Sequence, residues 1–155
     1  NGNKVIFCGN GGSAADSQHL AAELIGKFYF NRRSLPAISL TVNTSIITAI
    51  GNDFGFDKAF ARQLEGIGKA GDVLIGLSTS GNSENVVEAF RLAKELGIST
   101  VAFTGESGGI LRNLTDILIN IPSNDTPRIQ EAHIMVGHII CELVEKEFVV
   151  NSRQE

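Results

Sequence analysis

Two cysteines stand among the 155 residues, and no apolar run approaches the roughly 20 residues that a membrane-spanning helix needs. Cys8 and Cys141 lie in apolar segments without CxxC spacing, which indicates two buried free thiols rather than a disulfide. The N-terminus also lacks the charged and then apolar pattern of a secretory signal. These absences predict a cytoplasmic protein without a membrane span.

Clusters of one charge sign are missing as well. The net charge of −4 comes from 13 Lys and Arg against 17 Asp and Glu, spread along the chain. Without a basic run there is no electrostatic footprint for nucleic acid or an anionic membrane, and we expect neither partner. The length suits one domain with its own core, so residues 1–155 are expected to form a single domain. The first residue is Asn1 and not Met, and we expect further residues upstream of it.

Short apolar segments alternate with helical patterns along the chain. None of the apolar segments alternates cleanly with polar residues, which suits parallel strands covered on both faces. The expected strands are Lys4–Cys8, Pro36–Leu40, Asp72–Leu77, Ser99–Phe103 and Asp116–Ile121. The expected helices are Ser13–Phe28, Ser45–Ile50, Asp57–Ile67, Ser83–Leu96 and Pro127–Phe148. This order predicts an α/β fold, an open doubly wound parallel five-stranded sheet flanked by helices.

The last expected helix is apolar on two sides. Thr126 can cap it, and Pro127 suits its first position. The stripe expected to face the sheet is Ile129, Ala132, Val136, Ile140, Leu143 and Val144. Another side carries Ile134, Gly137 and Cys141, flanked by Gln130 and His138. A helix with two apolar sides usually has two partners, so we expect an oligomer.

A glycine-rich turn follows the first expected strand. Gly9, Gly11 and Gly12 precede a helix whose free N–H groups and positive dipole end can hold a phosphate. The segment formally matches the GxGxxA pattern of dinucleotide folds, but "SLTVNTS" lacks the acid that would bind a ribose. The lysine of GxxxxGK[ST] is also absent. Dinucleotide and triphosphate sites are therefore disfavoured.

A second loop, "STSGNSENV" from Ser78 to Val86, combines hydroxyls, a glycine and the start of a helix. It contains no Lys or Arg, so the single phosphate of a small phosphoester fits it better than a polyphosphate does. A plain capped turn would use the same residue types. Because its polar donors exceed what capping needs, we favour a phosphate cradle. The five polar donors are Ser78, Thr79, Ser80, Asn82 and Ser83.

Two further patterns leave the choice between function and structure open. In "GNDFGFD", Asn52 and Asp53 could accept hydroxyl hydrogens from a polyol, or could simply build a turn. His19 and Glu23 share one helix face at i and i+4, where they could chelate a metal or form an ordinary pair. Gln130 and His138 lie two turns apart, about 12 Å along their helix, near the limit for reaching one ion. His133 points elsewhere and is expected to be structural.

Five stretches resemble, in order, the phosphoheptose isomerases of the sugar isomerase (SIS) domain family, and the resemblance covers almost the whole chain. They are "CGNGGSAADSQHLAAEL", "AIGNDFGF", "AGDVLIGLSTSGNSENV", "TGESGG" and "RIQEAHIMVGHIICELVEKE". The resemblance implies a single SIS domain of flavodoxin-like fold and a homotetramer. Members of the family carry an N-terminal helical segment before the first strand, which this sequence lacks.

The resemblance also implies an activity and a site. The activity is conversion of sedoheptulose 7-phosphate to D-glycero-D-manno-heptose 7-phosphate, which supplies the heptose of lipopolysaccharide or related glycans. It implies one zinc ion held by His19, Glu23, Gln130 and His138, and an acid/base pair of Glu23 and His138. Phosphate would bind Ser78, Thr79, Ser80 and Ser83. The sugar would contact Asn10, Gly11, Gly12, Glu23, Asn52, Asp53 and Gln130.

Two non-catalytic SIS classes are alternatives. One associates with the replication initiator, and its members do not hold a glutamate and a histidine at the positions of Glu23 and His138. The other is a regulatory domain that binds a sugar phosphate without turning it over, and it would not need the expected metal-binding set. The chain has both Glu23 and His138 and an intact "STSGNS", which favours the enzyme. An enediol route suits these residues, because it needs a base for a carbon-bound proton and an acid at the carbonyl.

Overall fold

The computed structural model describes residues 2–151 and contains one sheet of five parallel strands. The strands are β1 (Val5–Gly9), β2 (Ala37–Ser39), β3 (Val73–Ser78), β4 (Ser99–Thr104) and β5 (Ile117–Asn120). Their order across the sheet is β2-β1-β3-β4-β5, as in flavodoxin-like folds. The predicted α/β class and all five strands are confirmed, and each strand end lies within one residue of its expected position.

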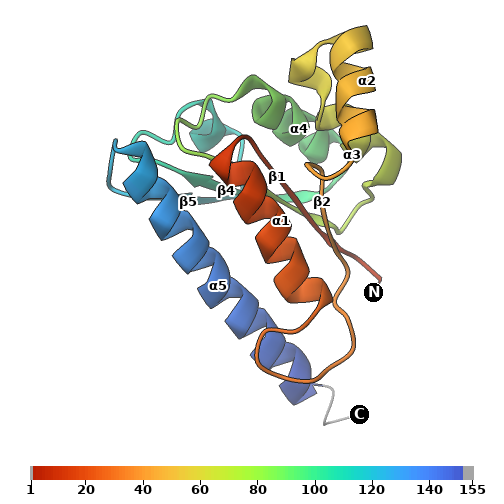
Figure 1. Cartoon of the computed structure of the whole chain (residues 1–155), viewed down its shortest axis with the longest axis vertical. Helices are drawn as coiled ribbons and strands as arrows, with labels where there is room; N and C mark the ends of the chain where they lie inside the picture. Colours follow the sequence, from red (N-terminus) through yellow and green to blue (C-terminus); the bar gives the residue numbers. More distant parts are fainter. Residues whose placement is uncertain (1, 152–155) are drawn as a thin grey trace.

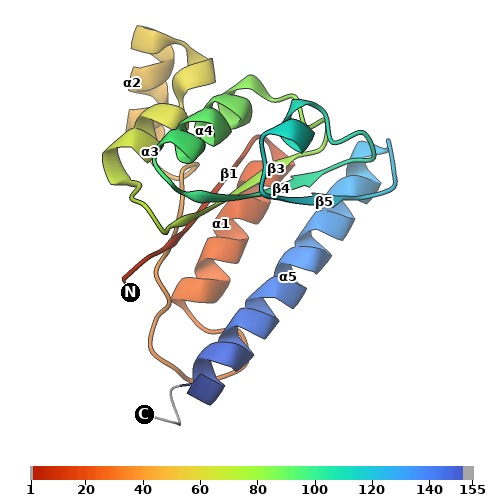
Figure 2. The ribbon, with the colours of Figure 1, turned by 180° about the vertical axis from the view of Figure 1, so that it is seen from behind.

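Helices cover both faces of the sheet (Figures 1 and 2). One face carries α3 (Ala61–Ile67) and α4 (Glu84–Glu95), and the other carries α1 (Gly12–Ile25) and α5 (Thr126–Asn151). In β1, Ile6 and Cys8 belong to the first core while Phe7 belongs to the second. Successive side chains of a strand point to opposite faces, so strands buried on both sides lose the apolar and polar alternation.

The remaining elements lie on the side of the sheet that carries α3 and α4. α2 (Thr44–Phe54) stands beside α3, at the top right of Figure 1. Two short 3₁₀ helices, Phe56–Lys58 and Ile110–Asn113, precede α3 and β5. Within the described residues, no helix is long and apolar enough to cross a membrane.

Four of the five expected helices differ from the structure by more than one residue at an end. α1 ends at Ile25 instead of Phe28, because Gly26 follows and the chain turns away there. α2 continues through Gly51 to Phe54, so "GND" is helical and not a loop. The expected helix from Asp57 to Ile67 is divided into a 3₁₀ turn and α3, with buried residues where the two meet. α5 begins at Thr126, where Asp125 provides the carbonyl for the first turn, and ends at Asn151, three residues past the expected Phe148.

The buried face of α5 also differs from the predicted stripe. Leu143 and Val144 are 59% and 42% exposed. The buried row instead repeats every four residues and consists of Ile129, His133, Gly137, Cys141 and Glu145. Gly137 lets Leu20 of α1 approach so closely that a Cβ there would lie 2.6 Å from a Leu20 methyl carbon. The prediction was wrong because it chose the buried face by hydrophobicity. Two residues of the buried row are ionisable and one is glycine, so this face did not read as apolar.

Both thiols are free and buried, as predicted for Cys8 and Cys141. Burial raises the pKa of Cys8 to about 12 and that of Cys141 to about 11. A thiol must lose its proton to act as a nucleophile or metal ligand. At neutral pH both cysteines therefore act as core residues.

Candidate active site

The carboxyl ends of β1 and β3 lie side by side, because Gly9 pairs with Leu77 in the parallel register. The loops that follow these strands open at the same edge of the sheet, where open α/β sheets bind ligands. The side-chain amides of Asn10 and Asn85 exchange two hydrogen bonds of 2.8 Å, which tie the first loop to the start of α4. The sequence prediction missed Asn85, because an asparagine beside a helix cap is unremarkable until its burial and its partner are known.

Residues 78–83 run from the end of β3 to the start of α4, where the sequence predicts a phosphate cradle. The hydroxyls of Ser78 and Ser83 lie 2.9 Å apart, and the Ser80 hydroxyl accepts a hydrogen bond from the N–H of Asn82. Ser83 precedes α4, yet its side chain does not cap that helix. A plain capped turn would use the Ser83 hydroxyl on the helix itself. The Ser83 hydroxyl therefore pairs with Ser78 instead of capping α4, and the phosphate cradle stays a prediction.

The backbone of this cradle is held by the segment after β4. The N–H of Gly105 donates to the carbonyl of Thr79 over 2.9 Å. Gly81 has φ +68°, and a Cβ there would lie 2.1 Å from the carbonyl oxygen of Gly108. Only glycine fits a left-handed position with so close a backbone neighbour. The fold thus fixes the backbone of this loop at Thr79 and at Gly81.

His19, Glu23 and His138 form a cluster at the contact of α1 and α5. His19 Nε2 lies 3.0 Å from Glu23 Oε1 and 3.3 Å from His138 Nε2. One ligand atom from each residue lies within 4.8 Å of the others, so the three could hold a metal ion together. The predicted i and i+4 pairing of His19 with Glu23 is confirmed. His138, 119 residues away from His19 in the sequence, joins them through the packing of the two helices.

Gln130 belongs to α5, and its side chain lies against the start of α1. A Cβ on Gly12 would be 2.7 Å from Gln130 Nε2, so glycine leaves the room that this amide occupies. Gly11, with φ +56°, precedes it at the N-cap of α1. His19 stands two turns further along α1, about 10.5 Å at 1.5 Å per residue. The Gln130 side chain therefore borders the glycine turn, and its expected place among the metal ligands stays a prediction.

Asn52 and Asp53 lie in the last turn of α2 and are exposed. Within residues 2–151, these two side chains hydrogen-bond only to each other, with Asn52 Nδ2 donating to Asp53 Oδ1 over 2.8 Å. The structure of this single chain therefore does not bring them to the other expected site residues. The expectation of a loop was wrong at these positions, because helix α2 runs on to Phe54.

Two other ionisable side chains, Asp16 of α1 and His133 of α5, lie on the helices that carry the cluster. Burial raises the pKa of Asp16, one turn before His19, while the charges of His19 and His138 act to lower it. Sequence reading missed Asp16, since nothing in its spacing points to a histidine on another helix. His133 is buried and donates from Nε2 to the carbonyl of Thr104, and burial lowers its pKa. Its predicted structural role agrees with this contact.

Comparison with known proteins identifies the family. The SIS domain model matches residues 1–105. Phosphoheptose isomerase from Clostridium acetobutylicum is 62% identical over 146 residues, which cover 94% of this chain and 74% of that protein. The protein of the same name from Akkermansia muciniphila is 59% identical, over 94% of this chain and 77% of its own length. The chain belongs to the phosphoheptose isomerases of the SIS domain family.

Solved structures of this family share the fold described above. The structure of phosphoheptose isomerase from Neisseria gonorrhoeae is 48% identical, with a TM-score of 0.88 over 93% of this chain and 77% of that one. A phosphoheptose isomerase from Francisella tularensis is 40% identical, with a TM-score of 0.91 over 94% of this chain and 78% of its own. The five-stranded SIS fold predicted from the sequence is confirmed.

Proposed function

We propose that the chain isomerises sedoheptulose 7-phosphate to D-glycero-D-manno-heptose 7-phosphate through an enediol. The observation that carries the proposal is the cluster of Glu23 and His138, which joins a carboxylate and an imidazole from two helices in a member of this family. Neither non-catalytic alternative needs that pair. The reaction requires a base for a carbon-bound proton and an acid at the carbonyl oxygen, and these side chains supply both.

The proton transfers can be assigned to particular atoms. The Glu23 carboxylate removes a proton from C1 of the ketose and returns it to C2. The His138 imidazole delivers a proton to the oxygen on C2 and accepts the one on the C1 oxygen. The substrate gains and loses no atoms in total, and the carbonyl moves from C2 to C1.

We propose zinc as the metal of this site. Zinc bound to nitrogen and oxygen at about 2.0–2.1 Å in a tetrahedron has ligand atoms about 3.3 Å apart. The separations of 3.0 and 3.3 Å around His19 Nε2 come close to that spacing. When bound, zinc would polarise the sugar carbonyl or hold the two helices together. Gln130 would be its fourth ligand after turning away from Gly12.

The substrate would extend from the serine cradle to the cluster. Its phosphate would accept hydrogen bonds from the hydroxyls of Ser78, Thr79, Ser80 and Ser83 at the N-terminus of α4. Asn10, Gly11, Gly12 and Gln130 would line the carbon chain beside α1. The two turns of α1 between Gly12 and His19 suit an open-chain heptose phosphate, whose reactive carbons lie at the end opposite the phosphate.

The decisive experiment is proton NMR of the protein with sedoheptulose 7-phosphate in D₂O, with added zinc and again after chelation. We expect aldoheptose phosphate that carries solvent deuterium at C2, and loss of turnover on chelation. Neither product nor exchange in a folded, zinc-loaded sample would overturn the isomerase proposal. Full activity in the chelated sample would overturn the metal assignment alone.

We also propose a cytoplasmic homotetramer. Met135, Ile139 and Leu143 of α5 are 58%, 48% and 59% exposed, and such an apolar helix side commonly packs on a partner. In an assembly, Asn52 and Asp53 could reach the site of a neighbouring copy. Sedimentation equilibrium should give four times the protomer mass, and a monomer at micromolar concentration would contradict this.

A further inference from the structure

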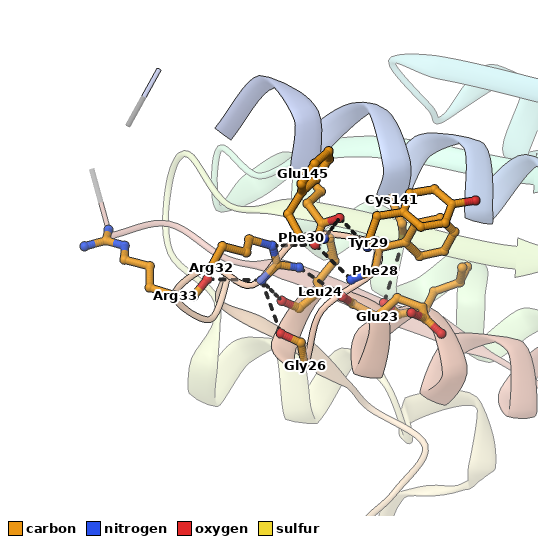
Figure 3. Close-up of polar contacts among 11 residues, drawn as sticks. Glu23, Leu24, Gly26, Phe28, Tyr29, Phe30, Arg32, Arg33, Cys141 and Glu145 are labelled. Atoms are coloured by element: carbon orange, nitrogen blue, oxygen red, sulfur yellow. Dashed lines mark hydrogen bonds and ion pairs between the residues drawn. The ribbon is translucent and has the colours of Figure 1, made fainter. Parts of the chain in front are cut away.

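Glu145 is a fully buried carboxylate on α5, seven residues beyond His138 (Figure 3). Its oxygens accept three backbone N–H groups, those of Phe28 (2.8 Å), Tyr29 (2.6 Å) and Phe30 (3.1 Å). Burial alone would raise the pKa of Glu145, but these bonds and the nearby guanidinium of Arg32 outweigh it and lower the pKa. The carboxylate is therefore ionised at neutral pH and fixes the loop that follows α1.

Arg32 connects this carboxylate to the end of α1 (Figure 3). Its Nε lies 2.9 Å from Glu145 Oε1, and both side chains are almost completely buried. One terminal nitrogen donates to the carbonyl of Leu24 over 2.9 Å, and the other donates to the carbonyl of Glu23 over 3.1 Å. The last carbonyls of a helix have no partner within it. Arg32 supplies that partner, and one of the carbonyls belongs to the proposed base.

The same carboxylate also acts on the His138 side of the cluster. Glu145 holds the N–H of Phe28, and the Phe28 ring lies 5.7 Å from the His138 ring. The Phe28 ring thus packs beside the imidazole, and the hydrogen bond to Glu145 holds the Phe28 backbone in place. Neither Glu145 nor Arg32 touches the reacting atoms, so both would act through other residues.

We propose that the Arg32–Glu145 ion pair is the positioning element of this active site. It holds the backbone of Glu23 on α1 and, through Phe28, the imidazole of His138 on α5. The pair joins the two helices that carry the acid and the base. This inference rests on the proposed isomerase function.

The test compares kcat, KM and thermal unfolding of the zinc-loaded protein with those of Glu145→Gln and Arg32→Lys. Gln keeps the size of the Glu145 side chain but replaces one carboxylate oxygen by an NH₂ group. That group cannot accept a hydrogen bond from the backbone N–H that faces it. Lys keeps the charge but cannot contact Glu145 and the α1 carbonyls together. We expect kcat to fall at least about tenfold in the folded variants, with KM within about threefold, since a misplacement of about 1 Å can cost about a hundredfold.

Glu142→Gln is the matched control, because Glu142 lies one turn earlier on α5 in a partly exposed pair with Lys146. It should retain wild-type kcat. A folded Glu145→Gln or Arg32→Lys protein with kcat within twofold of wild type would overturn the positioning role, whatever its thermal stability. Should Glu145→Gln fail to fold, Arg32→Lys decides the question. Absence of turnover in the wild type would instead reject the proposed function.

Discussion

At the scale of single residues, Glu23 and His138 have distinct roles that substitution can separate. Glu23→Gln removes the base while it keeps the shape of the side chain, and His138→Ala removes the acid. We expect each to lower kcat by about 100-fold or more, because general acid–base catalysis commonly contributes 10²–10⁴-fold. The measurement is turnover of sedoheptulose 7-phosphate, with circular dichroism to verify the fold. Glu131→Gln, on the exposed side of α5, is the control, and substantial activity in either site variant would contradict the assignment.

The hydroxyl of Ser80 tests the phosphate cradle in the same way. Ser80 is exposed in the loop after β3, and its hydroxyl accepts only a local N–H in this structure. Ser80→Ala should raise KM by about threefold to tenfold and change kcat less, because the lost bond holds the phosphate in ground state and transition state alike. Ser99 is the first residue of β4, at the edge of the sheet opposite the loop that contains Ser80. Ser99→Ala should therefore change neither KM nor kcat. An unchanged KM for Ser80→Ala would argue against the cradle.

At the scale of elements, replacing glycine by alanine should change the free energy of unfolding in opposite directions at two positions. Gly81→Ala places a Cβ against the carbonyl of Gly108 in a left-handed backbone, and should lower the free energy of unfolding by about 1–3 kcal/mol. Gly51→Ala meets no atom within 4 Å and lies inside α2, so it should raise that free energy by about 0.5–1 kcal/mol. Urea unfolding of both variants measures the difference. Equal stabilities would show that the approach of the two loops is not tight.

Helix α5 shows where element-scale prediction from sequence fails. Its position after β5 and most of its length followed from the sequence pattern, but its last three residues and its buried face did not. His133 can be buried because the backbone carbonyl of Thr104 accepts a hydrogen bond from its Nε2–H. Glu145 can be buried because backbone N–H groups and an arginine surround it. Those partners come from β4 and from the loop after α1. A single-helix pattern contains neither, so it assigned the burial to leucine and valine instead.

At the scale of the whole molecule, acid stability depends on carboxylates that tie the sheet together. Asp72 is fully buried at the start of β3 and accepts hydrogen bonds from the backbone and side chain of Lys4 and from the N–H of Lys69. Burial alone would raise the pKa of Asp72, but these bonds outweigh it and hold the pKa below the ordinary value of 3.8. The stabilisation is therefore present above that value and is lost as the pH falls through the folded-state pKa.

Asp72→Asn tests this linkage. The variant should be less stable at neutral pH by about 1–3 kcal/mol and should lose less further stability on acidification than the wild type. Urea unfolding at about pH 7 and about pH 3.5 gives both quantities. Asp125→Asn, on an exposed carboxylate, should match the wild type at both pH values. A wild-type pH dependence in Asp72→Asn would show that other carboxylates dominate acid unfolding.

The sequence by itself determined the α/β class, the five strands, the loop chemistry after β1 and β3, and the pairing of His19 with Glu23. These follow from local patterns, because strand apolarity, turn residues and i,i+4 spacing act over a few residues. Tertiary structure decided that His138 meets His19, that Asn85 holds Asn10, and that Gln130 lies against Gly12. It also decided that the charges of two histidines act on the pKa of Asp16, and that Arg32 and Glu145 lie buried together. Each of these contacts joins segments that are neighbours only once α1, α4 and α5 have packed on the sheet.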